Sequence, residues 1–497
     1  MSYSQTRKTL FYSLLSVSAS LNACNYIPDN QNTKPNIIII LTDQQTMKAM
    51  SATGNPLVKT PSMDKLAASG IRFTRAYCTA PVCGPSRASL ISGMMPSETG
   101  VIYNGDTLLK NISTVGDIFR GVGYETVWAG KWHLPESYPQ RSAAKPEHKS
   151  IQGFDVLPFW DSGKERWILG AETDGPLTES VVNYLKNYDK SKPLFLTVSY
   201  HNPHDICFHP RKDGWVSKDD SLLEIRYLGF DYKLPDPIGI HPDELNDLPP
   251  LPENHLIALN EPEFITDKRL SHNTYGVETM FANKFSDMEW KSYLYSYYRL
   301  TEMVDIEIGK LLKAIEDSEY NENTIILFTS DHGDGASAHK WAAKLSLYEE
   351  SVNVPFIMVY PEYINPGSVD DSNLVSLADI VPTMCDYAGI NTDIPFAGKS
   401  LRPLLDRETE SLRDYLITEL ADYKPDTTRV GYMVLSQKFK YTVFSHGKNN
   451  QQFFDLESDP GEMNNLAEDS SYIQLINKHE EYLKTWKMQR RLVTHVQ

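Results

Sequence analysis

The sequence is poor in cysteine, has no excess of basic residues and contains no long hydrophobic run beyond its N-terminal segment. Its 497 residues include five cysteines, an odd number without a CxxC pair, which argues against a disulfide framework. The formal charge of −17 argues against a nucleic acid or an acidic membrane surface as partner, because such partners need a basic field. No later stretch approaches the ~18 apolar residues of a membrane-spanning helix.

The first residues have the pattern of an export signal. Arg7 and Lys8 form a basic start, and residues 11–21 form an apolar segment too short to span a membrane as a mature helix. Leu21-Asn22-Ala23-Cys24 resembles a bacterial lipobox, in which the cysteine becomes the lipidated first residue of the mature protein. Cys24 is therefore predicted to carry a lipid, and simple cleavage nearby is the alternative.

Four apolar runs lead directly into polar residues. Runs of this kind are typical of parallel strands that are buried on both faces, and helical patterns lie between them. The alternation of strands and helices predicts an α/β fold with a large open sheet. The runs and the residues after them are NIIIILTDQQ with Asp43 and Gln44, YETVWAGKWH with Lys131 and His133, LFLTVSYHNPH with His201 and His204, and TIILFTSDHGD with Asp331 and His332.

Changes of pattern divide the chain into parts. Residues 1–24 are predicted to be the signal peptide, 25–35 a tether, and 36–408 the catalytic domain. Within it, residues 205–290 carry many prolines and aspartates without regular periodicity, which favours a cap-like excursion over the site. Residues 409–497 alternate between polar and apolar positions before a final helical pattern, which predicts a smaller subdomain with an antiparallel sheet and a helix.

Two pairs of polar residues, Asp43 with Gln44 and Asp331 with His332, indicate a metal site. Ligands bind beyond the carboxyl ends of the strands in open α/β sheets, so the two pairs are expected to meet there. Their three oxygen-bearing side chains and one imidazole suit a hard divalent cation, most simply Ca²⁺, whereas Zn²⁺ would call for more His or Cys. Each pair by itself could also cap a turn. The expected metal ligands are Asp43, Gln44, Asp331 and His332.

Cys83 lies in the segment APVCGPSRASLISG at the expected start of a helix. Pro85 suits the first helical turn and Gly93 a helix end. The free N–H groups of such a terminus attract anions and lower the pKa of a thiol. The sequence therefore predicts a nucleophile facing the metal, and an inert, buried thiol is the alternative.

These residues carry a resemblance to a known family. Cys83-Gly84-Pro85-Ser86-Arg87 matches the C-x-P-S-R signature of the formylglycine-dependent sulfatases, a branch of the alkaline phosphatase superfamily. Other blocks resemble those of the family in the same order, from about residue 35 to 470: PNIIIILTDQQ, GKWHL, HNPH, SDHGD, KLSLYEESVNVPFIM and FFDLESDPGEMNNLA. The resemblance implies a large, mostly parallel mixed sheet sandwiched by helices, with a smaller C-terminal antiparallel sheet.

The resemblance also implies roles for the matched positions. In this family a separate maturation enzyme oxidises the motif cysteine to formylglycine, whose hydrate keeps a second hydroxyl that allows sulfate to leave. Cys83 would then be both the modified nucleophile and a metal contact. Arg87 and Lys131 match residues that steady the hydrate, with His133 as their partner, while Lys344 and His204 match residues that hold the sulfate. We expect His204 to be the general acid toward the leaving alcohol.

Gln44 departs from the family pattern, in which Asp is common at this position. The amide oxygen is still a competent ligand, so the departure lowers the charge of the cage without removing a donor. Additional residues near the expected site are candidates for substrate binding, although each could equally close a turn or lie on a solvated surface. They are His201, Asp205, Arg211, Lys212, His339 and Trp341.

The sequence therefore predicts an exported, Ca²⁺-dependent sulfatase that hydrolyses a sulfate ester of a carbohydrate. The expected location is the periplasm or the outer membrane of a Gram-negative bacterium, with membrane contact only through the lipid on Cys24. A phosphate or phosphonate monoester hydrolase of the same superfamily is one alternative. A catalytically silent lipoprotein that binds sulfated glycans is another, but a binding protein has no need of a nucleophile at position 83.

Overall fold

The computed structural model describes residues 34–134, 150–157, 170–208, 248–271, 285–318, 323–361, 363–421 and 429–490. Several predicted features lie outside these ranges: the signal peptide with Cys24, nearly all of the tether, Arg211, Lys212 and much of the excursion at 205–290.

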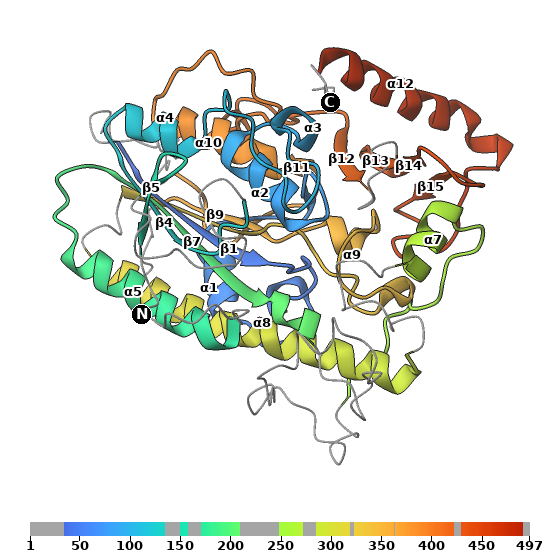
Figure 1. Ribbon diagram of the computed structural model, residues 1–497, viewed down its shortest axis with the longest axis horizontal. Helices are drawn as coiled ribbons and strands as arrows, with labels where there is room; N and C mark the ends of the chain where they lie inside the picture. Colours follow the sequence, from blue (N-terminus) through green and yellow to red (C-terminus); the bar gives the residue numbers. More distant parts are fainter. Residues whose placement is uncertain are drawn as a thin grey trace, which may run out of the picture. The chain divides into compact units, whose positions relative to one another are not determined.

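A large mixed sheet forms the centre of the described part of the chain (Figure 1). Nine strands pair in the order β10-β2-β9-β8-β1-β7-β4-β6-β5. The inner strands β8, β1, β7, β4 and β6 are parallel, and antiparallel pairs occur only toward the edges. The strands are β1 Asn36–Asp43, β2 Ile71–Phe73, β4 Glu125–Gly130, β5 Ser150–Ile151, β6 Phe154–Leu157, β7 Leu194–Pro203, β8 Thr324–Ser330, β9 Phe356–Val359 and β10 Ser368–Asp370.

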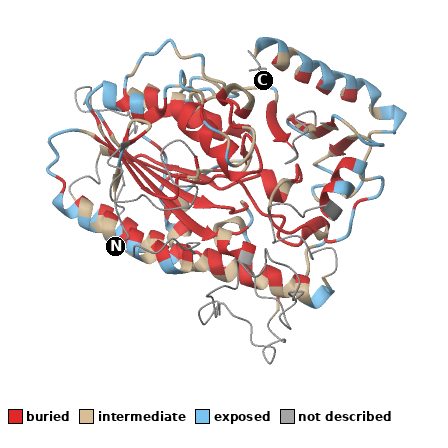
Figure 2. Cartoon of the chain, in the orientation of Figure 1, coloured by how far each residue is buried: buried red, intermediate tan, exposed pale blue. Residues whose placement is uncertain are grey.

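Helices cover both faces of this sheet, which confirms the α/β fold that the sequence predicts (Figure 1). Alternate residues of β1 enter opposite cores: Ile38 and Ile40 pack toward α1, α5 and α8, whereas Ile37 and Ile39 pack toward α2, α4 and α10. This burial on both faces explains the unbroken apolar run of β1 (Figure 2). The helices are α1 Pro61–Ser69, α2 Cys83–Ser92, α3 Pro96–Thr99, α4 Val115–Gly121, α5 Gly170–Asn187, α7 Glu263–Ser271, α8 Asp287–Glu316, α9 Glu349–Val352, α10 Ile380–Tyr387, α11 Arg402–Leu405 and α12 Ile473–Gln489.

The parallel register brings the ends of four strands to one edge. Thr42 pairs with Ser330, Asp43 with Pro203, and Gly130 with Ser199. The polar residues that follow these strands therefore leave the sheet close together, at the edge where open α/β sheets bind their ligands.

A four-stranded antiparallel sheet follows in the C-terminal part, as the sequence predicts. One of its faces joins the main core through Leu420, Met433 and Phe454, and the other packs under α12. Its strands are β12 Leu416–Ala421, β13 Val430–Leu435, β14 Phe439–Phe444 and β15 Gln451–Asp455, and a separate pair joins β3 Ala76–Tyr77 to β11 Val375–Ser376.

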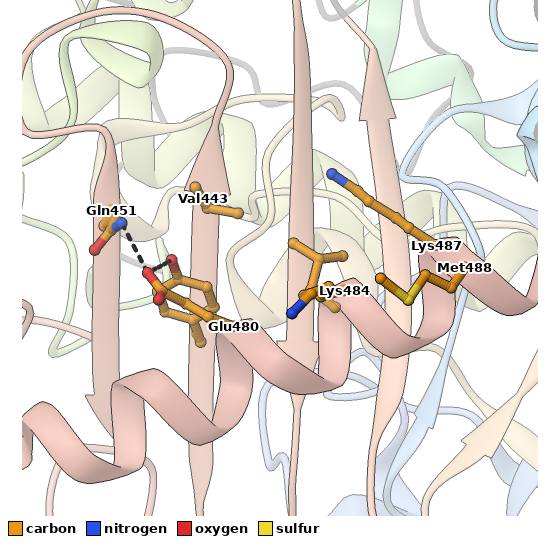
Figure 3. A pocket seen from close by; sticks show the side chains of 8 residues that line it. Val443, Gln451, Glu480, Lys484, Lys487 and Met488 are labelled. Carbon is orange, nitrogen blue, oxygen red and sulfur yellow. Dashed lines mark hydrogen bonds between the residues drawn. The ribbon is translucent and has the colours of Figure 1, made fainter.

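A shallow groove of about 500 Å³ lies between α12 and this sheet (Figure 3). The Glu480 carboxylate accepts hydrogen bonds from Tyr441 Oη at 3.2 Å and Gln451 Nε2 at 3.3 Å, which hold the helix onto the strands. None of the side chains that line the groove belongs to the predicted catalytic or metal residues, so its size alone does not identify it as a functional site.

Helix α7 lies inside the excursion at 205–290, where the sequence shows no clear periodicity. It is only two turns long, which is too short for a helical pattern to stand out. Glu263 in its first turn and Lys268 and Arg269 in its last turn complement the helix dipole. Among the described helices, none is both long and apolar enough to cross a membrane.

Gly130 allows β4 to end directly beside β7. Its φ of +93° is one that L-residues rarely adopt, and an added Cβ would lie 2.0 Å from the Ser199 carbonyl oxygen. Lys131, the next residue, donates its backbone N–H to that same oxygen at 2.9 Å. A side chain at position 130 would therefore push apart the two strands that position Lys131.

We predict that Gly130→Ala destabilises the protein more than Gly123→Ala does. Gly123 has the same φ of +93° but no atom within 4 Å of an added Cβ, so its substitution costs only backbone strain of about 1–2 kcal/mol. Gly130→Ala adds a steric clash, which raises the loss by a further ~1–3 kcal/mol. Urea unfolding of the two variants measures the difference, and equal losses would contradict this explanation.

Candidate active site

Cys83 is the first residue of α2 and points into a cluster of polar side chains from the strand ends. Its Sγ lies 3.1 Å from His332 Nε2, 3.3 Å from Lys344 Nζ and 3.8 Å from Asp43 Oδ1. Val82 before it has an extended backbone, and Gly93 ends the helix with a φ of +70°. The helix start therefore delivers the thiol to the edge of the sheet where β1 and β8 end.

Arg87 connects the two aspartates of the cluster. Its Nη2 donates to Asp43 Oδ2 at 2.9 Å, and its Nε donates to Asp331 Oδ2 at 2.8 Å. Its Nη1 donates to the Lys131 carbonyl and to Ser199 Oγ, both at 2.9 Å. All three charged groups are fully buried, so the guanidinium is the counter-charge that lets both carboxylates be buried together.

The two carboxyl groups titrate differently. Burial by itself would raise the pKa of Asp43, but the charges of Lys131 and Arg87 outweigh it and hold that pKa well below its ordinary value. Lys131 Nζ lies 2.6 Å from Asp43 Oδ2. Burial, followed by the negative charge of Asp43, raises the pKa of Asp331 to about 6.

Ligand atoms for a cation converge beside Cys83. One atom each from Asp43, Cys83, Asp331 and His332 lies within 4.8 Å of the others. His332 Nδ1 lies 2.8 Å from the Gly333 carbonyl oxygen, which can only accept a hydrogen bond, so Nδ1 carries a proton and Nε2 is the ring nitrogen that faces the cluster and would bind a cation. The aspartates bind Arg87 through Oδ2, while Asp43 Oδ1 lies 3.8 Å from Cys83 Sγ and Asp331 Oδ1 lies 3.8 Å from His332 Nε2. This donor set fits a divalent cation.

Asp334 orients Gln44, the fourth predicted ligand. Gln44 Nε2 donates to Asp334 Oδ2 at 2.8 Å, so the amide oxygen turns toward Lys344 Nζ, which lies 3.0 Å away. Tyr293 donates to the same carboxylate. Asp334 is the last residue of the SDHGD block, but it could not be recognised from the sequence, because nothing in that block indicates which aspartate orients another ligand.

Cationic side chains surround the thiol. Burial and the charge of Asp43 raise the pKa of Cys83, but Lys344, His332 and Lys131 outweigh them and bring it well below its ordinary value. Burial lowers the pKa of His133, although the nearby thiol of Cys83 acts in the opposite direction. The structure therefore brings His133, Lys131 and Lys344 to the thiol that the sequence identifies as nucleophile.

His204 begins the short turn His204–Phe208 after β7, and its pKa responds to the charges of the same cluster. Burial and then the charges of Lys131 and Lys344 lower the pKa of His204 to about 3. Cys207 lies beside it, 3.8 Å from His204 Nε2, and donates to Gln44 Oε1 at 3.5 Å. Cys207 gave no signal in the sequence, since an isolated thiol is usually a small core residue.

Two candidate substrate residues lie at the end of β7 and within this turn. The Asp205 carboxylate accepts the backbone N–H groups of Gly170 and Ala171, both at 2.9 Å, and so caps the start of α5. His201 is buried, donates its backbone N–H to Asp174 and leaves its Nε2 without a hydrogen-bond partner. His201 therefore has a ring nitrogen available for a substrate, whereas both carboxylate oxygens of Asp205 accept hydrogen bonds from the start of α5.

The other two described candidates are buried in the loop before Lys344. Trp341 Nε1 donates to the Lys344 carbonyl at 3.0 Å and so supports the loop that carries this lysine. The His339 ring stacks on Tyr348 at 3.8 Å and belongs to a separate cluster with Glu350.

Residues 35–390 match the sequence model of the sulfatase family, and residues 337–489 match that of the N-sulphoglucosamine sulphohydrolase C-terminal region. Two relatives come from Bacteroides thetaiotaomicron. An N-acetylglucosamine-6-O-sulfatase is 28% identical over 94% of this chain and 89% of its own length. A Delta 4,5-hexuronate-2-O-sulfatase is 30% identical over 90% of this chain and 88% of its own length.

The fold agrees with these matches. The solved structure of a 2-O GAG sulfatase is similar with a TM-score of 0.76 at 28% identity, over 92% of each chain. Because the family match covers most of the sequence and the structural match nearly all of it, the chain belongs to the sulfatase family of sulfuric ester hydrolases.

Proposed function

We propose that this protein hydrolyses sulfate esters of carbohydrates with Cys83, converted to formylglycine, as the nucleophile. The observation that carries the proposal is the position of Cys83 at the start of α2, in contact with His332, Lys344 and the carboxylate of Asp43. A binding protein would need the cations but not a nucleophilic position among them. The hydrated aldehyde supplies a second hydroxyl, which allows sulfate to be released after transfer.

One Ca²⁺ ion is the metal that we propose for the donor set. Oxygen atoms of Asp43, Asp331 and Gln44 and the Nε2 atom of His332 would hold it, and Ca²⁺ accepts such mixed, oxygen-rich coordination. When bound, the ion supplies positive charge next to the sulfuryl oxygens.

The chain's own residues supply the rest of the chemistry. Lys131 and Lys344 offset the negative charge that develops on the sulfuryl oxygens, in a buried site where such charge pairing is strong. His204 donates a proton to the departing alcohol oxygen. Its imidazole is neutral in the free site, and the negative charge of a bound sulfate next to it would favour the protonated form.

We propose a carbohydrate substrate because relatives similar over nearly the whole chain are named for sugar sulfates, on N-acetylglucosamine and on hexuronate. A sugar hydroxyl is a poor leaving group, which suits a site with a general acid. We further propose export to the periplasm or outer membrane with a lipid on Cys24, from the N-terminal pattern, and maturation of Cys83 by a separate formylglycine-generating enzyme.

Replacing Cys83 by alanine tests the proposed function. We expect Cys83→Ala to lower sulfate release from sulfated sugars by at least ~10³-fold, because no other group in the cluster can replace the nucleophile. The matched control is Cys385→Ala, which removes a buried thiol in the core outside the site and should retain activity. Undiminished sulfate release by Cys83→Ala would refute the proposal.

Removing calcium should destabilise the protein as well as inactivate it. A ligand that binds only the folded state at 100 times its Kd adds about 2.7 kcal/mol of stability. Thermal unfolding after treatment with EGTA, with and without added Ca²⁺, measures this gain. Asp331→Asn, which removes one carboxylate ligand, should not respond to Ca²⁺. A wild-type protein that is equally stable and active in both conditions would contradict the assignment.

Substitution of His204 should slow hydrolysis to an extent that depends on the leaving group of the substrate. We expect His204→Ala to slow hydrolysis of a sugar sulfate by about 10²–10⁴-fold, since the alkoxide must be protonated as it departs. The same variant should lose far less on 4-nitrophenyl sulfate, whose leaving group needs no proton. A ratio of the two rates that is unchanged from wild type would exclude His204 as general acid, because misfolding lowers both rates equally.

A further inference from the structure

A second group of potential ligands lies apart from Cys83. His339, Glu350 and Glu462 are buried, and one ligand atom from each lies within 4.8 Å of the others. They come from three different segments: the short turn Ala338–Lys340, helix α9 and the loop after β15. None of them has a role in the reaction proposed above.

Hydrogen-bond acceptors outnumber donors in this cluster. Asn254 Nδ2 carries two hydrogens but faces three acceptors: Glu350 Oε1 at 3.0 Å, His339 Nε2 at 3.3 Å and the Gly461 carbonyl at 3.3 Å. The second oxygen of Glu350, Oε2, has no hydrogen-bond partner although it is buried and lies 4.0 Å from His339 Nε2. A buried carboxylate oxygen without a partner is costly, so Glu350 Oε2 has room for a donor or a cation.

The neighbouring cation is shared among too many carboxylates to fill this gap. Lys440 Nζ lies 2.7 Å from Glu462 and 3.2 Å from Glu349, both through Oε1. Arg269 is already paired with Glu261. Lys440 is therefore already shared by two other carboxylates, and Lys48 is the charged lysine that lines the cavity beside Glu350.

A cavity leads to the cluster from the surface. It has a volume of about 580 Å³, and Glu349 and Glu350 line it together with Lys48, Arg75 and Tyr77. An ion could therefore reach the carboxylate of Glu350 without unfolding of the surrounding core.

We propose that His339, Glu350 and Glu462 bind a second divalent metal ion, of the kind that combines imidazole and carboxylate ligands, with Zn²⁺ as the representative. Three protein ligands are few for Ca²⁺, which takes 6–8 oxygens, whereas Zn²⁺ is held by about four ligands including His and Glu. The ion would join the turn with His339 to α9. These two elements lie on either side of Lys344 in the sequence, so the ion would stabilise the loop that presents this lysine to the active site.

Zinc binding to purified full-length protein tests the proposal. The measurement uses the Cys83→Ala protein, in which no active-site thiol at position 83 can bind Zn²⁺, after removal of metals with a chelator. Titration with Zn²⁺ alone, followed by elemental analysis, should show one bound ion. A protein that carries Glu350→Gln as a second substitution should bind this ion at least ~10-fold more weakly. Glu349→Gln, the neighbouring carboxylate outside the ligand set, is the matched control and should keep the ion.

Two further measurements make the outcome decisive. Asp331→Asn should leave this zinc ion in place, since it alters only the other cluster. Anomalous diffraction at the zinc edge from crystals of the Cys83→Ala protein should place the ion between His339 and Glu350, which does not depend on whether the Glu350 variant folds. The proposal is overturned if no zinc binds, if Glu350→Gln and Glu349→Gln behave alike, or if the anomalous signal lies only beside Asp43.

Discussion

The ion pairs of Arg87 with Asp43 and Asp331 are the interaction on which the active site depends. Two buried carboxylates from adjacent strands repel each other, and the planar guanidinium offsets this repulsion by binding one oxygen of each. Loss of one partner from such a buried pair typically costs about 3–5 kcal/mol. Arg87 follows Cys83 by about one turn of α2, so the contact that joins β1 to β8 also fixes the nucleophile.

One short segment links the active site to the second cluster. The chain from His332 to Glu350 carries a predicted metal ligand, the aspartate that orients Gln44, the His339 turn and Lys344. Its conformation is held by buried contacts rather than by regular structure, since only a short turn and the start of α9 are helical. Disturbing either cluster is therefore expected to move Lys344.

The sequence predicted the parts of the fold and site that leave a local signal. The run of isoleucines in β1 indicated a strand buried on both faces, and Pro85 and Gly93 indicated the bounds of α2. The parallel arrangement then implied that the strand ends would meet. Asp334 and Cys207 could not be predicted in this way, because their contacts with Gln44 join residues far apart in the sequence. The cluster around Glu350 depends likewise on three distant segments.

The central claim is that the protein prefers sulfate esters to phosphate esters. The main alternative is a phosphate or phosphonate monoester hydrolase. The most direct test compares kcat/KM for a sulfate ester and the matching phosphate ester of the same sugar. The two pairs are the 6-sulfate and 6-phosphate of N-acetylglucosamine, and the 2-sulfate and 2-phosphate of a hexuronate. The protein is one whose Cys83 conversion has been verified by mass spectrometry. The account predicts that the sulfate ester of at least one sugar is hydrolysed much faster than its phosphate. Faster turnover of the phosphates, with no sulfate released from either sugar, would contradict it.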